Sequence, residues 1–240
     1  MLEKTRGIVL QNYKYGESSI ISHVYTEVFG RKSFILKGVR SKKSKNKSNL
    51  LQNLFILNFE IYNKEGKDLL LVKEFTNAIA FSDFPFNPLK SSQAIFLSEI
   101  LSKCLQEESS NLDLFNFLIN SIEYFDLHTK NISNFHLAFL MKLTPYLGIL
   151  PSSRVDSNHI FFDLREGEFS GVEPFHADYM DKNLSKILYK FYESNFDESL
   201  NISLNKSQRN DLLDQILKFY TIHNYKLDNL KSLGILRELF

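Results

Sequence analysis

Residues 30–47, Gly30-Arg-Lys-Ser-Phe-Ile-Leu-Lys-Gly-Val-Arg-Ser-Lys-Lys-Ser-Lys-Asn-Lys47, combine an apolar strand pattern with a dense run of positive charge. The side chains of Phe34 to Val39 predict a β-strand, whereas residues 41–49 contain no apolar side chain that a core would bury. No acidic residue occurs from Val28 to Phe59. The cations repel one another unless a polyanion approaches, although a solvated loop has the same pattern. Because the charge continues into a strand, we expect a surface that binds phosphate groups.

The charge of the whole chain is nearly balanced but unevenly distributed. The 240 residues have a formal net charge of +1, yet residues 1–80 contain 14 Lys and Arg against 7 Asp and Glu. The remaining residues contain 15 Lys and Arg against 21 Asp and Glu. Hydrophobic residues make up 43% of the chain and aromatic residues 14%, which is typical of a folded globular protein. We therefore expect a basic amino-terminal module followed by a mildly acidic one.

The amino-terminal residues and the cysteine content indicate the compartment. No apolar signal segment is present, and no apolar run approaches the ~20 residues of a membrane-spanning helix. We expect a cytoplasmic protein with no membrane partner. Cys104 is the single cysteine, which excludes an internal disulfide and a cysteine-rich zinc site. Its apolar helical surroundings predict a buried side chain.

Five short β-strands are predicted in the first 80 residues, because β-branched and aromatic runs alternate with turn signals. The predicted strands are Gly7–Tyr13, Ser18–Tyr25, Lys32–Val39, Leu54–Tyr62 and Leu69–Val72. A long basic connection separates the third strand from the fourth. This arrangement suits a small closed antiparallel barrel. The OB-fold, whose open face and loops bind oligonucleotides, is the obvious candidate.

The rest of the chain is predicted to be helical. The breaker cluster Phe84-Pro-Phe-Asn-Pro88 marks the boundary between domains 1–80 and 81–240. Residues 149–178 form an irregular insert with short β-like pieces. The predicted helices run from an N-cap at Ser91–Ser92 to Leu105, then over Leu112–Phe125, Asn134–Leu143, Leu184–Tyr192, Gln208–His223 and Asn229–Leu239. The predicted fold class is α+β, with a five-stranded OB-fold barrel followed by an all-α carboxy-terminal domain.

An ordered set of short motifs along nearly the whole chain resembles the RecO family of bacterial recombination mediators. The most specific motif lies in the third strand and its exit, Leu36-Lys-Gly-Val-Arg-Ser-Lys-Lys-Ser44. The others are Arg6-Gly-Ile-Val-Leu10, Tyr15-Gly-Glu17, Tyr25-Thr-Glu27, Gly30-Arg-Lys32, Ala94–Leu101, Leu140–Gly148 and Leu230–Leu239. Each motif alone is weak, and the order carries the resemblance.

The resemblance implies a protein that binds single- and double-stranded DNA and anneals complementary strands without catalytic turnover or a cofactor. It implies association with the nucleoid. It also implies partnership with RecR in loading RecA onto DNA that is covered by single-stranded DNA-binding protein. The acidic, Phe-ending tail of that DNA-binding protein is a further implied partner.

One departure from the family concerns a four-cysteine zinc site that many relatives carry after the third helix. The corresponding stretch, Ile149 to Asp178, contains no cysteine. His159 and His176 alone do not make a structural zinc site, which needs four ligands. We expect no metal, and we expect aromatic side chains to pack where zinc would have held the segment: Phe161, Phe162, Phe169 and Phe175.

The predicted DNA-binding residues are the cations of the third strand and the loop that follows it. Lys37 and Arg40 come first, then Lys42, Lys43, Lys45 and Lys47. Arg6, Arg31 and Lys32 are weaker candidates, because a solvated strand edge would explain them equally well. Among the aromatic residues of the barrel, the alternation predicts core positions for Phe34 and Phe59 and exposed, base-stacking positions for Tyr13 and Tyr15.

An acidic tail would require an apolar groove rimmed by cations. The cations near apolar helical faces in the second domain are Lys142, Arg209, Lys218, Lys231 and Arg237. An ordinary surface side chain explains each of them equally well.

Two other functions remain open at this stage. Carboxylates in the insert would suit a metal-dependent nuclease, although their spacing is irregular: Asp156, Asp163, Glu166 and Glu168. A protein-only adaptor would use the basic barrel to bind an acidic partner. The chain lacks the motifs of the common nucleotide-binding and hydrolytic enzymes, so we predict no catalytic residues.

Overall fold

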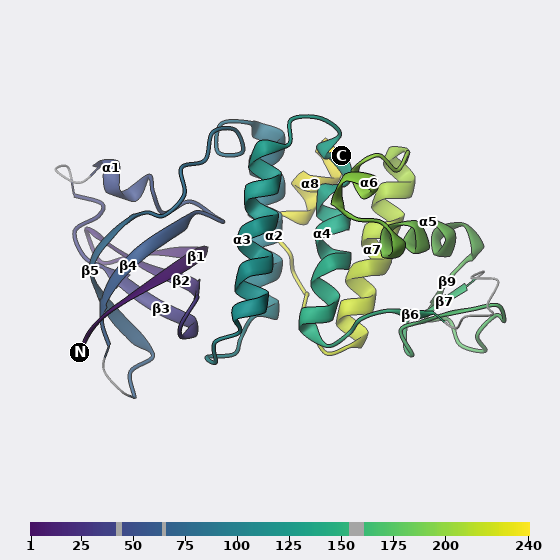
Figure 1. The fold of residues 1–240 in the computed structure, drawn as a ribbon, viewed down its shortest axis with the longest axis horizontal. Coiled ribbons are helices and arrows are strands. Elements are labelled where there is room, and N and C mark those ends of the chain that lie inside the picture. The colour runs from purple at the N-terminus through teal and green to yellow at the C-terminus, as the bar shows by residue number, and fades with distance from the viewer. Residues whose placement is uncertain (42–44, 64–65, 154–160) are drawn as a thin grey trace. The chain divides into compact units, whose positions relative to one another are not determined.

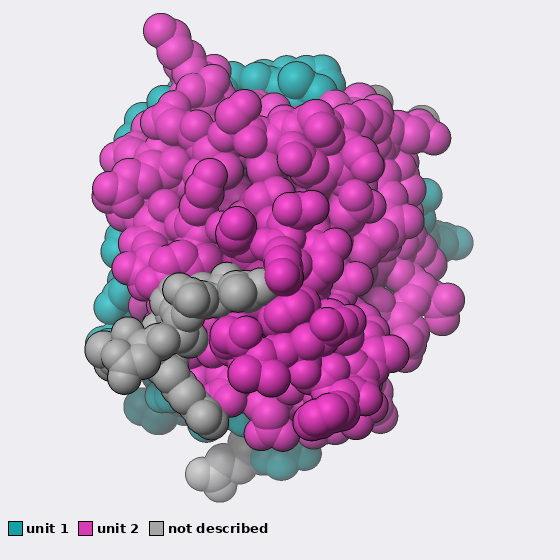
Figure 2. Space-filling view, turned by 90° about the vertical axis from the view of Figure 1, so that its right-hand side faces the viewer, with its two compact units in different colours: residues 1–127 teal, residues 128–240 magenta. Residues whose placement is uncertain are grey.

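The computed structural model describes residues 1–41, 45–63, 66–153 and 161–240. These residues form two compact units, Met1–Leu127 and His128–Phe240 (Figure 2). The change from strands to helices falls near residue 81, but two helices beyond it belong to the first compact unit. The domain division at residue 81 therefore stays a prediction.

The first unit begins with a closed five-stranded barrel (Figure 1). The order around the barrel is β1-β2-β3-β5-β4, and every pairing is antiparallel except β3 with β5. This confirms the predicted barrel. The strands are β1 (Leu2–Tyr15), β2 (Ser19–Thr26), β3 (Gly30–Leu36), β4 (Ile56–Tyr62) and β5 (Leu69–Asn77).

Alternating apolar side chains fill the barrel. Phe34 and Phe59 are buried, with ring centroids 5.0 Å apart, so both predicted core positions are confirmed. Gly7 lies where a Cβ atom would come within 2.4 Å of the Val24 side chain. The barrel thus has no room for a side chain at Gly7.

Two glycines define the ends of β3. Gly30 has a φ of +60°, and a Cβ atom there would lie 2.4 Å from the backbone oxygen of Ser109. Gly38 has a φ of +73° and ends the strand before Val39, where the prediction had extended it. The basic segment that follows contains a four-residue helix, α1 (Lys45–Ser48), which was predicted as loop.

Two helices complete the first unit, α2 (Pro88–Cys104) and α3 (Leu112–Leu127). α2 packs against β1. Asn87 caps α2 by accepting from the backbone of Leu89 and Lys90. The N-cap predicted at Ser91–Ser92 is therefore wrong, because Pro88 is tolerated at the first helical position and the helix begins there.

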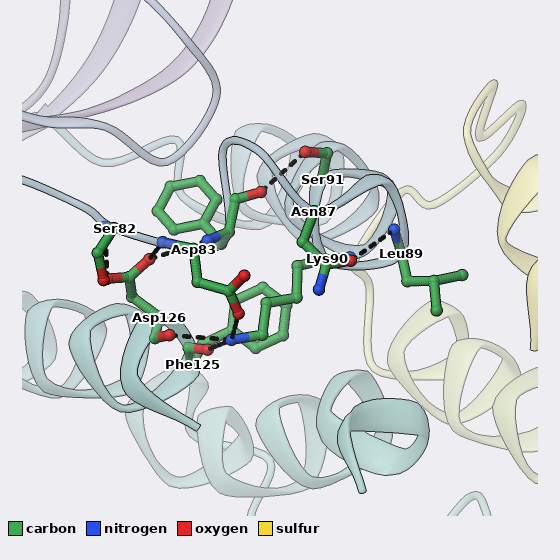
Figure 3. A network of polar contacts seen from close by, with 9 residues as sticks. Ser82, Asp83, Asn87, Leu89, Lys90, Ser91, Phe125 and Asp126 are labelled. Carbon is green, nitrogen blue, oxygen red and sulfur yellow. Dashed lines mark hydrogen bonds and ion pairs between the residues drawn. The ribbon is translucent and has the colours of Figure 1, made fainter. Parts of the chain in front are cut away.

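A buried polar network joins the end of the barrel to these helices (Figure 3). Lys90 is fully buried, and its Nζ atom lies 2.7 Å from Asp83 and donates to the carbonyls of Phe125 and Asp126 at 2.6 and 2.9 Å. The Asp126 carboxylate accepts from the backbone N–H groups of residues 82–84 and from the Ser82 hydroxyl. Burial acts to raise the pKa of Asp126, but these hydrogen bonds outweigh it and the pKa is lowered.

The second unit is built around α4 (Phe135–Leu143), which packs against α5, α6 and α7. The hydroxyl of Tyr220 donates to the Leu140 carbonyl at 2.6 Å and ties α7 to α4. The five-residue helix α6 was not predicted. The other elements are α5 (Lys182–Glu193), α6 (Phe196–Leu200), α7 (Lys206–Ile222), α8 (Leu233–Leu239) and two 3-10 turns, Ile132–Asn134 and Thr144–Leu147.

The insert of the second unit forms a small four-stranded sheet rather than an irregular loop. The strand order is β6-β8-β7-β9. The strands are β6 (Ser152–Ser153), β7 (Phe161–Asp163), β8 (Glu168–Ser170) and β9 (Tyr179–Met180). The β-like pieces that the sequence indicated therefore pair with each other.

Aromatic packing stabilises this sheet, as predicted for three of the four phenylalanines. Phe161, Phe162 and Phe169 are buried, and Phe162 packs on Phe169 and on Phe219 of α7. The prediction for Phe175 is wrong, because this side chain is fully exposed. It lies in the turn between β8 and β9, outside the paired strands.

Candidate nucleic-acid interface

Three predicted DNA-binding residues surround the exit of β3, and we call Lys37, Arg40 and Lys47 the basic exit. Lys37 and Lys47 are exposed. Arg40 donates from Nη1 to the carbonyls of Gly16 and Ser19, at 3.1 and 3.4 Å, and so fixes the exit to the β1–β2 turn. None of the three forms an ion pair with a residue that the structure describes. Their charges are therefore available to a ligand.

A hollow of about 340 Å³ lies beside the basic exit, between the end of β3 and the strand β5. Lys37, Lys47 and Lys73 supply its cations, and Glu74 supplies one carboxylate. Lys73 pairs with Glu60 at 3.1 Å. The sequence analysis missed Lys73, because only the parallel pairing of β3 with β5 brings this residue to the exit.

The remaining loop lysines are only partly placed. Lys42 and Lys43 lie outside the described residues. Lys45 begins α1, and only its backbone is described. Their proposed contribution to DNA binding therefore stays a prediction.

The other end of β3 carries cations that have internal partners. Arg31 is half-buried and donates from Nη1 to the carbonyls of Ser102 and Leu105 at the end of α2, at 3.1 and 3.4 Å. Its burial lowers the pKa of the guanidinium, partly offset by Tyr13. Lys32 forms an ion pair with Glu108. These two side chains connect the barrel to the segment after α2.

Arg6 is also held internally. Its guanidinium donates two hydrogen bonds to the Glu27 carboxylate, at 2.7 and 2.9 Å, and lies 5.6 Å from the ring centroid of Phe115. The hydrogen bond to Glu27 raises the pKa of Arg6, and the same bond lowers the pKa of Glu27. We therefore leave Arg6, Arg31 and Lys32 out of the proposed interface.

The two tyrosines predicted as exposed lie at the end of β1. Tyr13 is 45% exposed and Tyr15 is 52% exposed. Tyr13 packs edge-to-face on His23 with a centroid distance of 5.3 Å. Both rings are accessible to a ligand, and the ring of Tyr13 is held in place by its neighbour.

Cations of the second unit that were predicted to bind an acidic tail have internal partners. Arg209 donates to the backbone oxygens of Leu204 and Phe240 and to the side chain of Asn134. The other pairs are Lys142 with the Tyr192 carbonyl, Lys218 with Asp178, and Arg237 with Asp214. Lys231 is exposed. The structure thus uses most of these cations to join its own elements.

The carboxylates of the insert serve the fold of the insert. Asp163 accepts from the backbone of Arg165 and Glu166 and lies 3.1 Å from His176. Asp156 and His159 lie outside the described residues, and in the described part of the chain no three His, Cys, Asp or Glu side chains gather as metal ligands would. Among the described residues of the insert, Asp163 and His176 therefore bind each other and do not form part of a four-ligand zinc site.

Cys104 is buried, as predicted, and burial raises the pKa of its thiol to about 12. Over residues 1–41, 45–63, 66–153 and 161–240, every helix is too short or too polar to cross a membrane.

Comparison with known proteins identifies the family. The model of the amino-terminal domain of recombination protein O matches residues 1–78, and the model of its carboxy-terminal domain matches residues 85–234. A protein of Bacteroides fragilis named DNA repair protein RecO is 36% identical over the full length of both chains. A protein of the same name from Azobacteroides pseudotrichonymphae is 32% identical over 100% of both chains. Another, from Flavobacterium psychrophilum, is 35% identical over 99% of this chain and 98% of the relative. The chain therefore belongs to the RecO family of DNA repair proteins.

Proposed function

We propose that this protein is a non-catalytic mediator of recombinational repair that binds DNA through the basic exit and anneals complementary strands. One observation supports this proposal above the others. Within a single basic run, Lys32 pairs with Glu108 and Arg31 and Arg40 donate to backbone carbonyls, whereas the exposed Lys37 and Lys47 form no ion pair with a described residue. Lys37 and Lys47 line one hollow, and two such cations beside each other favour a polyanion as the ligand.

The chemistry of the exit suits binding without sequence preference. Each Lys or Arg that replaces a counterion on a phosphate adds salt-sensitive affinity, and lysine acts as a point charge that fixes no register. Such a surface reduces the repulsion between two strands while it leaves their bases free to pair. Both single- and double-stranded DNA are accordingly proposed ligands.

The finer assignments follow the family. We propose that the protein acts with RecR to load RecA onto DNA that is covered by single-stranded DNA-binding protein, in the cytoplasm and near the nucleoid. For the acidic tail of that DNA-binding protein we propose a contact at Lys231, because this side chain is exposed and is followed in α8 by the exposed Ile235 and Leu239, which lie one helical turn apart. No cofactor is required for this function.

Annealing of two complementary labelled oligonucleotides tests the proposal. We expect the wild-type protein to accelerate annealing and the variant Lys37→Gln/Lys47→Gln to do so several-fold less, because two phosphate contacts are lost. Arg31→Gln/Lys32→Gln removes the same charge from the other end of β3 and is the matched control. The proposal fails if neither DNA binding nor annealing occurs at low salt, and the protein-only adaptor then becomes the better explanation.

A further inference from the structure

A row of outward-facing apolar side chains crosses the barrel along directly paired positions, from one end of β1 to the other end of the same strand. Residues of all five strands contribute to this row. In order around the barrel, the members of this apolar belt are Leu2, Tyr62, Leu71, Ile35, Ile21 and Tyr13.

The belt faces away from the core. The neighbours of Ile35 along β3, Phe34 and Leu36, are buried inside the barrel, and successive side chains of a strand point to opposite faces. Tyr13, Tyr62 and Leu2 are 45%, 43% and 43% exposed, and the other members are partly exposed. A continuous exposed apolar surface of this kind marks a binding site more often than scattered apolar residues do.

One part of the belt forms a hollow of the size that a nucleobase requires. Tyr62, Leu69, Leu70, Leu71 and Lys67 line a space of about 370 Å³. A phenol ring beside aliphatic side chains offers a flat apolar surface to a base, and the lysine at its edge offers a charge to the adjoining phosphate.

Another part of the belt is held rigid before any ligand binds. The ring of Tyr13 meets the ring of His23 edge-to-face, at an interplanar angle of 86°. The Nδ1 atom of His23 lies 3.0 Å from the Ser33 hydroxyl. Burial, and then the charge of Arg31, lower the pKa of His23. Contacts from β1 through β2 to β3 thus hold the ring of Tyr13 in place. A base that stacks on this ring therefore costs little side-chain conformational entropy.

The belt is continuous with the basic exit. Lys37 follows Ile35 by two residues. Residues 69–71 of β5 line the hollow beside Tyr62, and residues 72–75 line the hollow beside Lys37 and Lys47. The nearest acidic position on β4, Glu60, is neutralised by Lys4 and Lys73. Cations beside exposed aromatic rings fit single-stranded nucleic acid better than they fit an acidic protein surface.

We propose that the apolar belt stacks unpaired nucleobases through Tyr13 and Tyr62, and that the barrel therefore binds single strands more tightly than duplex DNA. This inference rests on the proposed DNA binding at the basic exit. Bases in a duplex are paired and stacked on one another, so they reach the cations through their phosphates but do not reach the belt.

The first test uses the wild-type protein and two labelled single strands of equal length and charge, one of oligothymidine and one of abasic residues. We expect the oligothymidine to bind about 100-fold more tightly, because stacking on both tyrosines is lost with the abasic strand. Equal affinities would overturn the inference and leave the phosphate contacts intact. Absence of binding to either strand would overturn the proposed function as well.

The second test uses variants of the two exposed tyrosines. Tyr13→Ala and Tyr62→Ala should each weaken oligothymidine binding about tenfold, while Tyr13→Phe and Tyr62→Phe, which keep the ring, should retain it. Duplex affinity should not change in any of the four variants, which also shows that the barrel is folded. Equal losses for oligothymidine, abasic strand and duplex would overturn the inference, as would a belt that binds a second protein with no change in DNA affinity.

Discussion

The two ends of β3 carry the same kind of residue but use it differently. At one end, Arg31 and Lys32 bind the carbonyls at the end of α2 and the carboxylate of Glu108. At the other end, Lys37 projects without an ion pair among the described residues, next to the half-buried Arg40. The comparison teaches that a basic run does not by itself locate a binding surface. What distinguishes the proposed interface is that its exposed lysines, Lys37 and Lys47, form no ion pair with a residue that the structure describes.

The largest expected effect on stability concerns Lys90, a fully buried cation that pairs with Asp83. Lys90→Met leaves the carbonyls of Phe125 and Asp126 and the partly exposed Asp83 carboxylate without their shared donor, so it should lower the free energy of unfolding by about 3 kcal/mol. Urea denaturation followed by circular dichroism measures this change. The exposed Lys186 of α5 provides the control, since Lys186→Met should change the stability by less than about 0.5 kcal/mol. Equal stabilities of the two variants would contradict the role given to Lys90.

Asp126 extends the comparison to an anion with internal partners. Its lowered pKa means that it stabilises the fold above the ordinary aspartate pKa and that this stability is lost as the pH falls through the folded-state pKa. At pH 7, Asp126→Asn should be less stable than wild type by about 2–3 kcal/mol. The difference should shrink on acidification, measured by urea denaturation between pH 7 and pH 3. A stability difference that stays constant between pH 7 and pH 3 would show that the negative charge of Asp126 does not stabilise the network.

Arg31 tests the helix-facing end of β3 directly. Arg31→Met removes the side-chain donor of the Leu105 carbonyl and one of the two side-chain donors of the Ser102 carbonyl, which also accepts from Gln106, and should lower the free energy of unfolding by about 1–2 kcal/mol. Its affinity for a duplex oligonucleotide should stay within a factor of two of wild type, measured by fluorescence anisotropy. A large loss of DNA affinity with unchanged stability would move Arg31 into the interface.

The smallest expected effects separate two lysines that are five residues apart. Lys32→Met breaks a partly exposed ion pair and should cost less than about 1 kcal/mol of stability. Lys37→Met should leave the stability unchanged. It should lower DNA affinity about fivefold at 0.1 M salt, because one phosphate contact contributes about this factor. Thermal unfolding measures the stability of both variants, and fluorescence anisotropy titrations measure their DNA affinity. If the two variants behave alike, the contrast between the ends of β3 is wrong.

The barrel could be predicted from the sequence because its signals are local. Alternation placed Phe34 and Phe59 inside, and the turn residues separated all five strands. The end of β3 at Gly38 and the start of α2 at Pro88 were missed, since each depends on one residue's backbone conformation. The exposure of Phe175 was missed because it depends on the turn that carries the residue.

The candidate site was only partly predictable, because partners are a tertiary property. The sequence shows that Arg31, Lys32 and Lys37 are cations, but the carbonyls and the carboxylate that bind the first two come from residues 102–108. Lys73 and the apolar belt were missed for the same reason. They are brought to the site by strand register, which the periodicity of one strand does not reveal.

The most direct test of the account is the salt dependence of binding to a labelled ~30-mer single strand. With six cations engaged, the logarithm of the wild-type affinity should fall with the logarithm of salt concentration at a slope of roughly −4. Lys37→Gln/Lys47→Gln should flatten the slope by about 1.4, whereas Arg31→Gln/Lys32→Gln should leave it unchanged. A slope that flattens in the second variant and not in the first would contradict the assignment of the basic exit as the DNA-binding surface.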